Sequence, residues 1–109
     1  MPLSEHDLRG VLHYDPETGV FTWRVRRGPV HPGDVAGTLQ SRGYWKITID
    51  RTCYQAHNLA WLYMTGRWPE HEIDHIDRDK LNNRFANLRD VPSATNQYNI
   101  VAPQRNNTS

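Results

Sequence analysis

The sequence is poor in cysteine: Cys53 is the only one among 109 residues. One thiol cannot form a disulfide within the chain, nor can it supply the paired cysteines of a zinc knuckle. Long apolar runs are also missing, so no segment predicts a membrane-spanning helix. The first ten residues lack the basic and then apolar pattern of a secretory signal. We therefore expect a small cytoplasmic protein that is held together by packing alone.

A large excess of charge is missing as well, because the formal net charge is +1. Basic residues outnumber acidic ones by six to two in residues 20–52, whereas acidic residues outnumber basic ones by six to four in residues 70–90. This division suits a protein that contacts a polyanion with one part and holds a cation with another. On charge alone, however, ordinary scatter of surface charge is the favoured explanation.

The first twenty residues predict a short helix and a turn. Ser4 is a good N-cap for a helix over Ser4–His13, and residues 14–19, which include Asp15-Pro16 and Gly19, predict a turn. The helix would bury an apolar stripe of Leu8, Val11 and Leu12.

Alternation of apolar and polar residues predicts strands over 20–26 and 44–50, separated by a Gly- and Pro-rich loop over 27–43. Residues 52–55 can return as a third strand. We expect one small antiparallel sheet, with an apolar face against the core and a basic face that suits a polyanion. The basic residues expected to contact the polyanion are Arg24, Arg26, Arg42, Lys46 and, further along the chain, Arg89.

The second half predicts a helix that ends at Gly66, then two short strands on either side of a loop over 77–84, then a last helix that opens at Ser93. The expected ranges are 56–65 for the first helix and 73–76 and 88–91 for the strands.

Three stretches of this second half carry a recognisable pattern. They are Ile73-Asp74-His75-Ile76-Asp77, Asn82-Asn83-Arg84-Phe85-Ala86-Asn87-Leu88-Arg89 and Ser93-Ala94-Thr95-Asn96-Gln97-Tyr98-Asn99. The pattern resembles the His-Asn-His (HNH) endonuclease family, in which two short strands and a helix hold one divalent metal ion. Residues 54–66 and the turn at 14–19 resemble the small phage-borne branch of that family, although Asn58 stands where a basic residue is expected.

The resemblance implies a role for each signature residue. His75 and Asn87 would be catalytic, with His75 as the general base and Asn87 holding the loop over 77–84 by side-chain hydrogen bonds. Asp74 and Asn96 would bind the metal ion, Mg²⁺ or Mn²⁺, as hard oxygen ligands that leave room for water and phosphate. Imidazole suits the role of base because its unperturbed pKa is about 6.5. Neighbouring residues of a flat strand point to opposite faces, so Asp74 and His75 need a twisted ribbon to serve one reaction.

Other interpretations of the same residues remain open. His71-Glu72-Ile73-Asp74-His75 matches the zinc-protease string H-E-x-x-H, which works only on a helix. The Asp77-x-Asp79 pair begins like a calcium loop, but the pattern then fails. His57 is as consistent with a packed histidine as with a DNA contact. We expect Asn82, Asn83 and Asn99 to be turn and surface residues.

Taken together, the sequence predicts an α+β fold in a single domain over 1–109. A sheet-plus-helix part (1–68) binds double-stranded DNA, a ββα-metal nuclease unit (69–101) cuts it, and the tail (102–109) is loose. The expected reaction is metal-dependent hydrolysis of DNA that leaves 5′ phosphate and 3′ hydroxyl, in the cytoplasm of a bacterial cell. The alternative is a non-catalytic DNA-binding module with a vestigial metal site.

Overall fold

The computed structural model describes residues 3–92. Its first element is helix α1, Glu5–Val11, which Ser4 caps by accepting a hydrogen bond from the backbone N–H of Asp7 at 3.1 Å. The helix is shorter than the predicted Ser4–His13, because the chain passes directly into strand β1, Leu12–Asp15. Leu12 and Tyr14 are buried at the two-residue spacing of a strand. Pairing with the next strand therefore overrides the helical pattern at this end.

Strand β2, Val20–Trp23, forms a hairpin with β1 in which Tyr14 lies opposite Phe21. The turn predicted between them is present, but β2 ends before the expected Arg26. The backbone of Trp23 bonds instead to Gly33 and Asp34, so the chain turns away from the ladder here. The prediction that this strand shares a sheet with residues 44–50 is wrong, because its hydrogen-bonded partner is β1.

A second, three-stranded sheet has the order β3-β4-β5, with β3 Thr38–Leu39, β4 Trp45–Ile49 and β5 Thr52–Gln55. The tight turn at Asp50 and Arg51 has φ of 50° and 70°, as a two-residue antiparallel hairpin requires. Strand β3 falls inside the predicted loop, and both of its residues pair with β4. The predicted inward face is confirmed for Ile47 and Ile49, which are buried.

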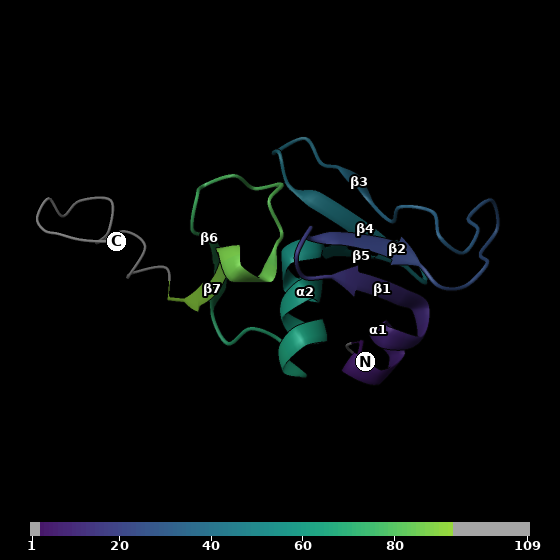
Figure 1. The fold of residues 1–109 in the computed structure, drawn as a ribbon, viewed down its shortest axis with the longest axis horizontal. Helices are drawn as coiled ribbons and strands as arrows, with labels where there is room; N and C mark the ends of the chain where they lie inside the picture. The colour runs from purple at the N-terminus through teal and green to yellow at the C-terminus, as the bar shows by residue number, and fades with distance from the viewer. Residues whose placement is uncertain (1–2, 93–109) are drawn as a thin grey trace, which may run out of the picture.

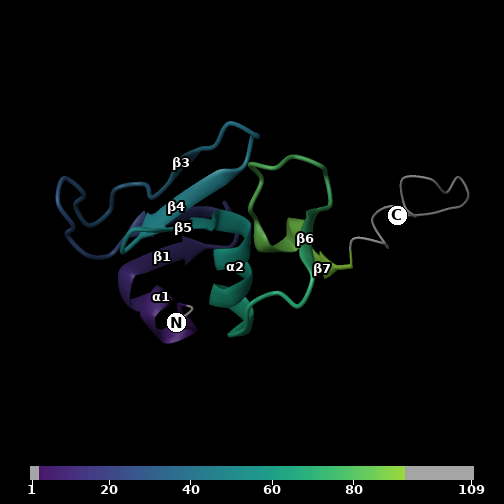
Figure 2. The same ribbon diagram turned by 180° about the vertical axis from the view of Figure 1, so that it is seen from behind.

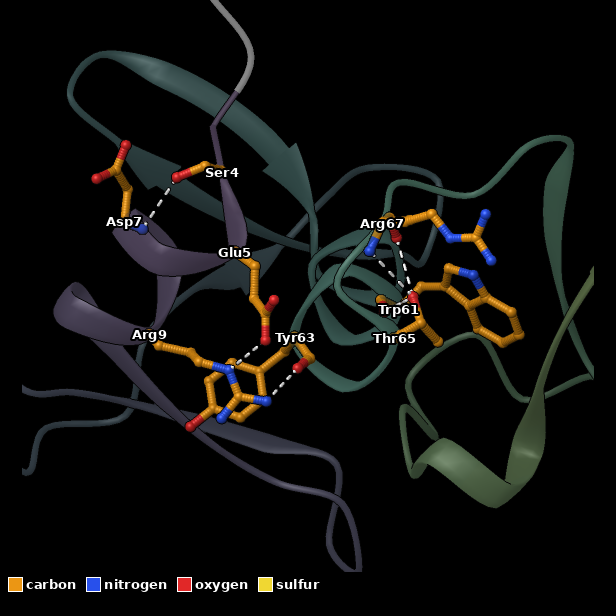
Figure 3. Close-up of polar contacts among 8 residues, drawn as sticks. All are labelled: Ser4, Glu5, Asp7, Arg9, Trp61, Tyr63, Thr65 and Arg67. Carbon is orange, nitrogen blue, oxygen red and sulfur yellow. Dashed lines mark hydrogen bonds and ion pairs between the residues drawn. The ribbon is translucent and has the colours of Figure 1, made fainter.

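Helix α2, Ala56–Thr65, stands at the centre of the molecule and contacts α1, β4, β5 and the later η1 (Figure 1). Its bounds agree with the prediction, and Gly66 ends it in the left-handed conformation. Arg9 ties α1 to α2, because its guanidinium donates to Glu5 at 2.8 Å and to the backbone carbonyl of Tyr63 at 2.6 Å (Figure 3). The core beneath is built from both helices, the β1–β2 hairpin and the three-stranded sheet, together with Leu88 further along the chain.

The third sheet is a two-stranded ribbon of β6, Glu72–His75, and β7, Leu88–Val91, with the 3₁₀ turn η1, Phe85–Asn87, directly before β7. It lies on the opposite side of α2 from the β1–β2 hairpin in both views (Figure 1, Figure 2). The last helix predicted from Ser93 lies outside the described residues. No helix in the described part combines the length and apolar character that crossing a lipid bilayer requires.

Candidate active site

The ribbon brings Asp74 opposite Arg89, and their side chains form an ion pair. Both Nε and Nη2 of Arg89 lie 2.8 Å from the same carboxylate oxygen, Oδ2. Arg89 was predicted to contact DNA, and here it holds the predicted metal ligand instead. The pairing register explains this, because residues directly opposite each other in an antiparallel ribbon have adjacent side chains.

His75, the next residue, points the other way and is only 7% exposed. Its Nε2 lies 2.9 Å from Oδ1 of Asn83. The ring meets that of His57 edge to face, with centroids 5.1 Å apart, and lies 6.4 Å from the ring of Tyr44. The alternation expected of a strand therefore holds, with Asp74 beside Arg89 and His75 turned toward the interior.

Asn83 was predicted to be a surface asparagine, and this prediction is wrong. Its residue exposure is 2%, and its side chain is the hydrogen-bond partner of His75. Asn82, directly before it, behaves as expected: its side chain donates to Asp77 in the loop, at 2.7 Å. The sequence could not separate the two asparagines, because both lie in a loop, where residue spacing does not indicate which side chain is buried.

Asn87 makes side-chain hydrogen bonds across the loop, as the sequence led us to expect. Its Oδ1 accepts from the backbone N–H of Asp77 at 3.0 Å, and its Nδ2 donates to Asp77 Oδ1 and to the carbonyl of Asn82, both at 2.9 Å. Hydrogen bonds from Asn82, then from the Asp79 backbone and from Asn87, lower the pKa of the Asp77 carboxyl below its ordinary value. The catalytic role of Asn87 stays a prediction.

His57 lies on the first turn of α2 and is 8% exposed. Burial, and secondarily the nearby His75, lower its pKa from 6.5 to about 4, so the ring is neutral at physiological pH. Within residues 3–92, its Nδ1 is buried without a hydrogen-bond partner. The sequence left a packed histidine and a DNA contact open for His57, and burial against Tyr44 and His75 favours the packed one.

The turn between β1 and β2 docks on the loop of the ribbon. The hydroxyl of Tyr14 donates to the backbone carbonyl of Asn83. Arg84 Nε donates to the carbonyl of Glu17 at 2.8 Å, and the N–H of Phe85 donates to the carbonyl of Pro16 at 3.2 Å. Residues far apart in the sequence thus meet beside Asn83, the hydrogen-bond partner of His75.

Most, but not all, of the predicted DNA-binding residues are exposed. Arg24, Arg26 and Arg42 are exposed, whereas Lys46 is half-buried. A cation that the sequence analysis did not select, Lys80, lies over the Tyr44 ring at 4.8 Å and donates to the carbonyl of Arg42 at 3.2 Å. Because Tyr44 also packs near His75, Lys80 and Arg42 belong to the surroundings of the candidate site.

Of the two predicted metal ligands, the structure describes only Asp74. Asp74 is half-buried, and Arg89 engages only its Oδ2; Oδ1 makes no hydrogen bond within residues 3–92. The second predicted ligand, Asn96, lies outside the described residues. Among the residues that the structure describes, no three His, Cys, Asp or Glu side chains gather to hold a metal ion. One hard carboxylate fits Mg²⁺ or Mn²⁺ with few protein ligands, provided that Arg89 shares Asp74 with it.

The zinc-protease interpretation does not fit the structure. Residues 72–75 form strand β6, not a helix. In addition, His71 is exposed while His75 is buried. The two histidines of the H-E-x-x-H string therefore do not share a helical face, which zinc binding by that motif requires.

Comparisons with known proteins agree with the expected family. A family model described as HNH endonuclease matches residues 54–98. No curated protein matches the sequence. A solved structure titled "DNA binding and cleavage by the HNH homing endonuclease I-HmuI" is similar with a TM-score of 0.66 and 23% sequence identity. The match covers 91% of this chain but only 56% of that one, so this chain spans little more than half its length.

The structural match confirms the mixed fold of small antiparallel sheets with helices. The matched range includes all four predicted catalytic and metal-binding residues, Asp74, His75, Asn87 and Asn96. Residues 54–98 of this chain are therefore similar to the HNH endonuclease family.

Proposed function

We propose that this protein is a DNA endonuclease that hydrolyses phosphodiester bonds. The observation that carries the proposal is the arrangement around the β6–β7 ribbon. Asp74 and His75 are adjacent on strand β6, and Asn87 ties down the loop between β6 and β7. That arrangement lies within the segment matched by the HNH endonuclease model.

In the proposed reaction, Asp74 and Asn96 would hold one divalent cation, Mg²⁺ or Mn²⁺. When bound, the cation would supply positive charge that offsets negative charge on the phosphate and at the leaving 3′ oxygen. His75 takes a proton from the attacking water, whose oxygen forms a new bond to phosphorus while the bond to the 3′ oxygen breaks. The leaving oxygen gains a proton, and the products carry 5′ phosphate and 3′ hydroxyl.

The proposal extends to the substrate and the setting. Double-stranded DNA would be bound through Arg24, Arg26, Arg42 and Lys46, because these cations can pair with backbone phosphates. We place the protein in the cytoplasm of a bacterial cell and its origin in a bacteriophage. We treat residues 1–109 as one domain, since the β1–β2 turn bonds to the ribbon loop.

Cleavage of a supercoiled plasmid tests this function. The wild type should relax or linearise the plasmid with Mg²⁺ or Mn²⁺ and stop with EDTA, and the ratio of nicked to linear product reports one- or two-strand cutting. His75→Ala should lose cleavage. Glu72→Ala is the matched control, because Glu72 lies on the same strand, is exposed and has no proposed role. Equal loss in both variants, with the fold intact, would contradict the assignment of His75.

One observation favours a second candidate function. Arg89 occupies Oδ2 of Asp74 through a hydrogen bond from Nε and an ion-pair contact from Nη2, as it would in a DNA-binding module whose metal site is vestigial. Such a module would bind duplex DNA in the same assay and leave the plasmid supercoiled at every metal concentration.

A further inference from the structure

Asn83 contacts both Tyr14 of the β1–β2 hairpin and His75, and the proposed reaction gives it no role. It is almost completely buried, its backbone carbonyl accepts from Tyr14, and its side-chain oxygen lies 2.9 Å from Nε2 of His75. A buried polar side chain that only filled space would leave its hydrogen-bonding groups unpaired at a cost, and an apolar residue would serve better. The side chain is therefore present for its partner, His75.

The identity of the bonding atoms decides which nitrogen of His75 carries the proton. An amide oxygen has no hydrogen to give, so Nε2 must donate the hydrogen bond to Oδ1. In the neutral ring, the other nitrogen, Nδ1, then keeps its lone pair. A general base needs that lone pair to accept a proton from water.

The position of Asn83 is itself fixed from outside the ribbon. Tyr14 of β1 holds its carbonyl, and the two residues are 69 positions apart in the sequence. Gly19, at the end of the β1–β2 turn, packs directly on the Asn83 backbone: a Cβ at this residue would lie 2.5 Å from the carbonyl carbon of Asn83. The hairpin therefore sets where the Asn83 side chain meets His75.

We propose that Asn83 is the positioning residue of the proposed general base. It holds the His75 ring in one orientation, with the proton on Nε2 and with Nδ1 available to the attacking water. This inference rests on the proposed function. It also gives the β1–β2 hairpin a role: through Tyr14 and Gly19, the hairpin holds Asn83 in place and so supports the catalytic histidine from the proposed DNA-binding part of the chain.

The first test is a long-range proton–nitrogen correlation spectrum of the imidazole rings in the full chain, without DNA or metal and at a pH where His75 is neutral. The spectrum of His75→Ala identifies the His75 signals. We expect the wild type to show Nε2 protonated and Nδ1 unprotonated. In Asn83→Leu, which keeps the number of side-chain heavy atoms but removes the acceptor, both nitrogen shifts should move toward the averaged values of an unconstrained ring. A wild-type ring protonated on Nδ1 would overturn the proposal.

The second test is single-turnover cleavage of a DNA duplex. Asn83→Leu should cut on the order of 10²-fold more slowly with DNA affinity unchanged, since small misplacement of a reacting group has costs of that size. Asn83→Asp keeps an acceptor oxygen at the same place and should recover both most of the rate and the wild-type tautomer. If Leu and Asp behave alike, Asn83 only fills space and the proposal is wrong.

The two readouts separate this inference from the proposed function. Absence of cleavage in the wild type, together with the expected tautomer, would refute the nuclease and leave the Asn83–His75 bond established. Cleavage by the wild type with an unchanged His75 tautomer in Asn83→Leu would refute the positioning role alone.

Discussion

Two imidazoles, those of His57 and His75, meet edge to face beneath the candidate site. The ring of His57 is buried among α2, Tyr44 and His75, and its pKa of about 4 keeps it neutral. A neutral neighbour adds no positive charge beside His75. We therefore interpret His57 as packing for the proposed base.

Burial of His57 predicts how stability depends on pH. Its pKa is about 4 in the folded chain and about 6.5 when exposed, so between these values the unfolded state binds more protons. The free energy of unfolding should therefore fall as the pH drops from about 6.5 to about 4, by at most about 3 kcal/mol from this group. Urea denaturation across this range should show the loss, and His57→Gln should reduce it. The same change at exposed His31 is the control, and an equal effect there would contradict the assignment.

Asp74 and His75 are adjacent in sequence but are proposed to do different work. Asp74→Ala should lose metal affinity and cleavage together. His75→Ala should keep its metal affinity and its binding to DNA, yet cut about 10²–10⁴-fold more slowly, which is the usual contribution of a general base. Calorimetric titration with Mn²⁺, beside single-turnover cleavage, measures both. Loss of the metal in His75→Ala and its retention in Asp74→Ala would reverse the two roles.

At the scale of elements, the contact between the β1–β2 turn and the ribbon loop is the feature that joins the two halves of the chain. Gly19 has φ of 77° and no space for a Cβ against Asn83 and Arg84. Gly28 also has a positive φ, 54°, but a Cβ there would meet nothing within 4 Å. A side chain would therefore strain the backbone at either glycine, but only at Gly19 would it also clash with neighbouring backbone atoms.

Gly19→Ala should consequently do more damage than Gly28→Ala. An alanine at positive φ costs about 1–2 kcal/mol at either position. At Gly19 the clash must also push the turn away from Asn83, so the additional result should be slower DNA cleavage. Urea denaturation and plasmid cleavage of both variants make the comparison. Normal cleavage by a folded Gly19→Ala protein would show that the docked turn does not support the site.

The elements that could be predicted are those whose residues carry a regular pattern of their own. Helix α2 was predicted with its exact end at Gly66, and β4, β5 and β7 followed from alternation or turn residues. Strand β1 was missed because Leu8 and Leu12 also fit a helical spacing, and pairing with β2 decided the outcome. The burial of Asn83 and the pair between Arg89 and Asp74 depend on contacts between segments, which no local pattern encodes.

At the scale of the whole molecule, the proposed DNA surface can be tested through salt. Arg24 and Arg26 are exposed, so replacing both by Gln should weaken binding to duplex DNA and lower the slope of log affinity against log salt by about two. Arg27→Gln is the matched control: it removes a charge from the same segment, but that guanidinium is already paired with Asp50. Unchanged binding by the double variant across a salt series would place the DNA elsewhere.

The hydrogen bond between Tyr14 and Asn83 has a consequence for the order of events in folding. The hairpins and α2 close over a few residues each, whereas this bond closes a loop of 69 residues, and the entropy cost of closure rises with loop length. We therefore expect local structure to form first and the surroundings of His75 to be completed only when the β1–β2 hairpin meets the loop of the ribbon. A partly folded chain would contain its helices and hairpins, but the side chain of His75 would not yet be held in place. During refolding, the capacity to cut DNA would return after the helical signal has already recovered.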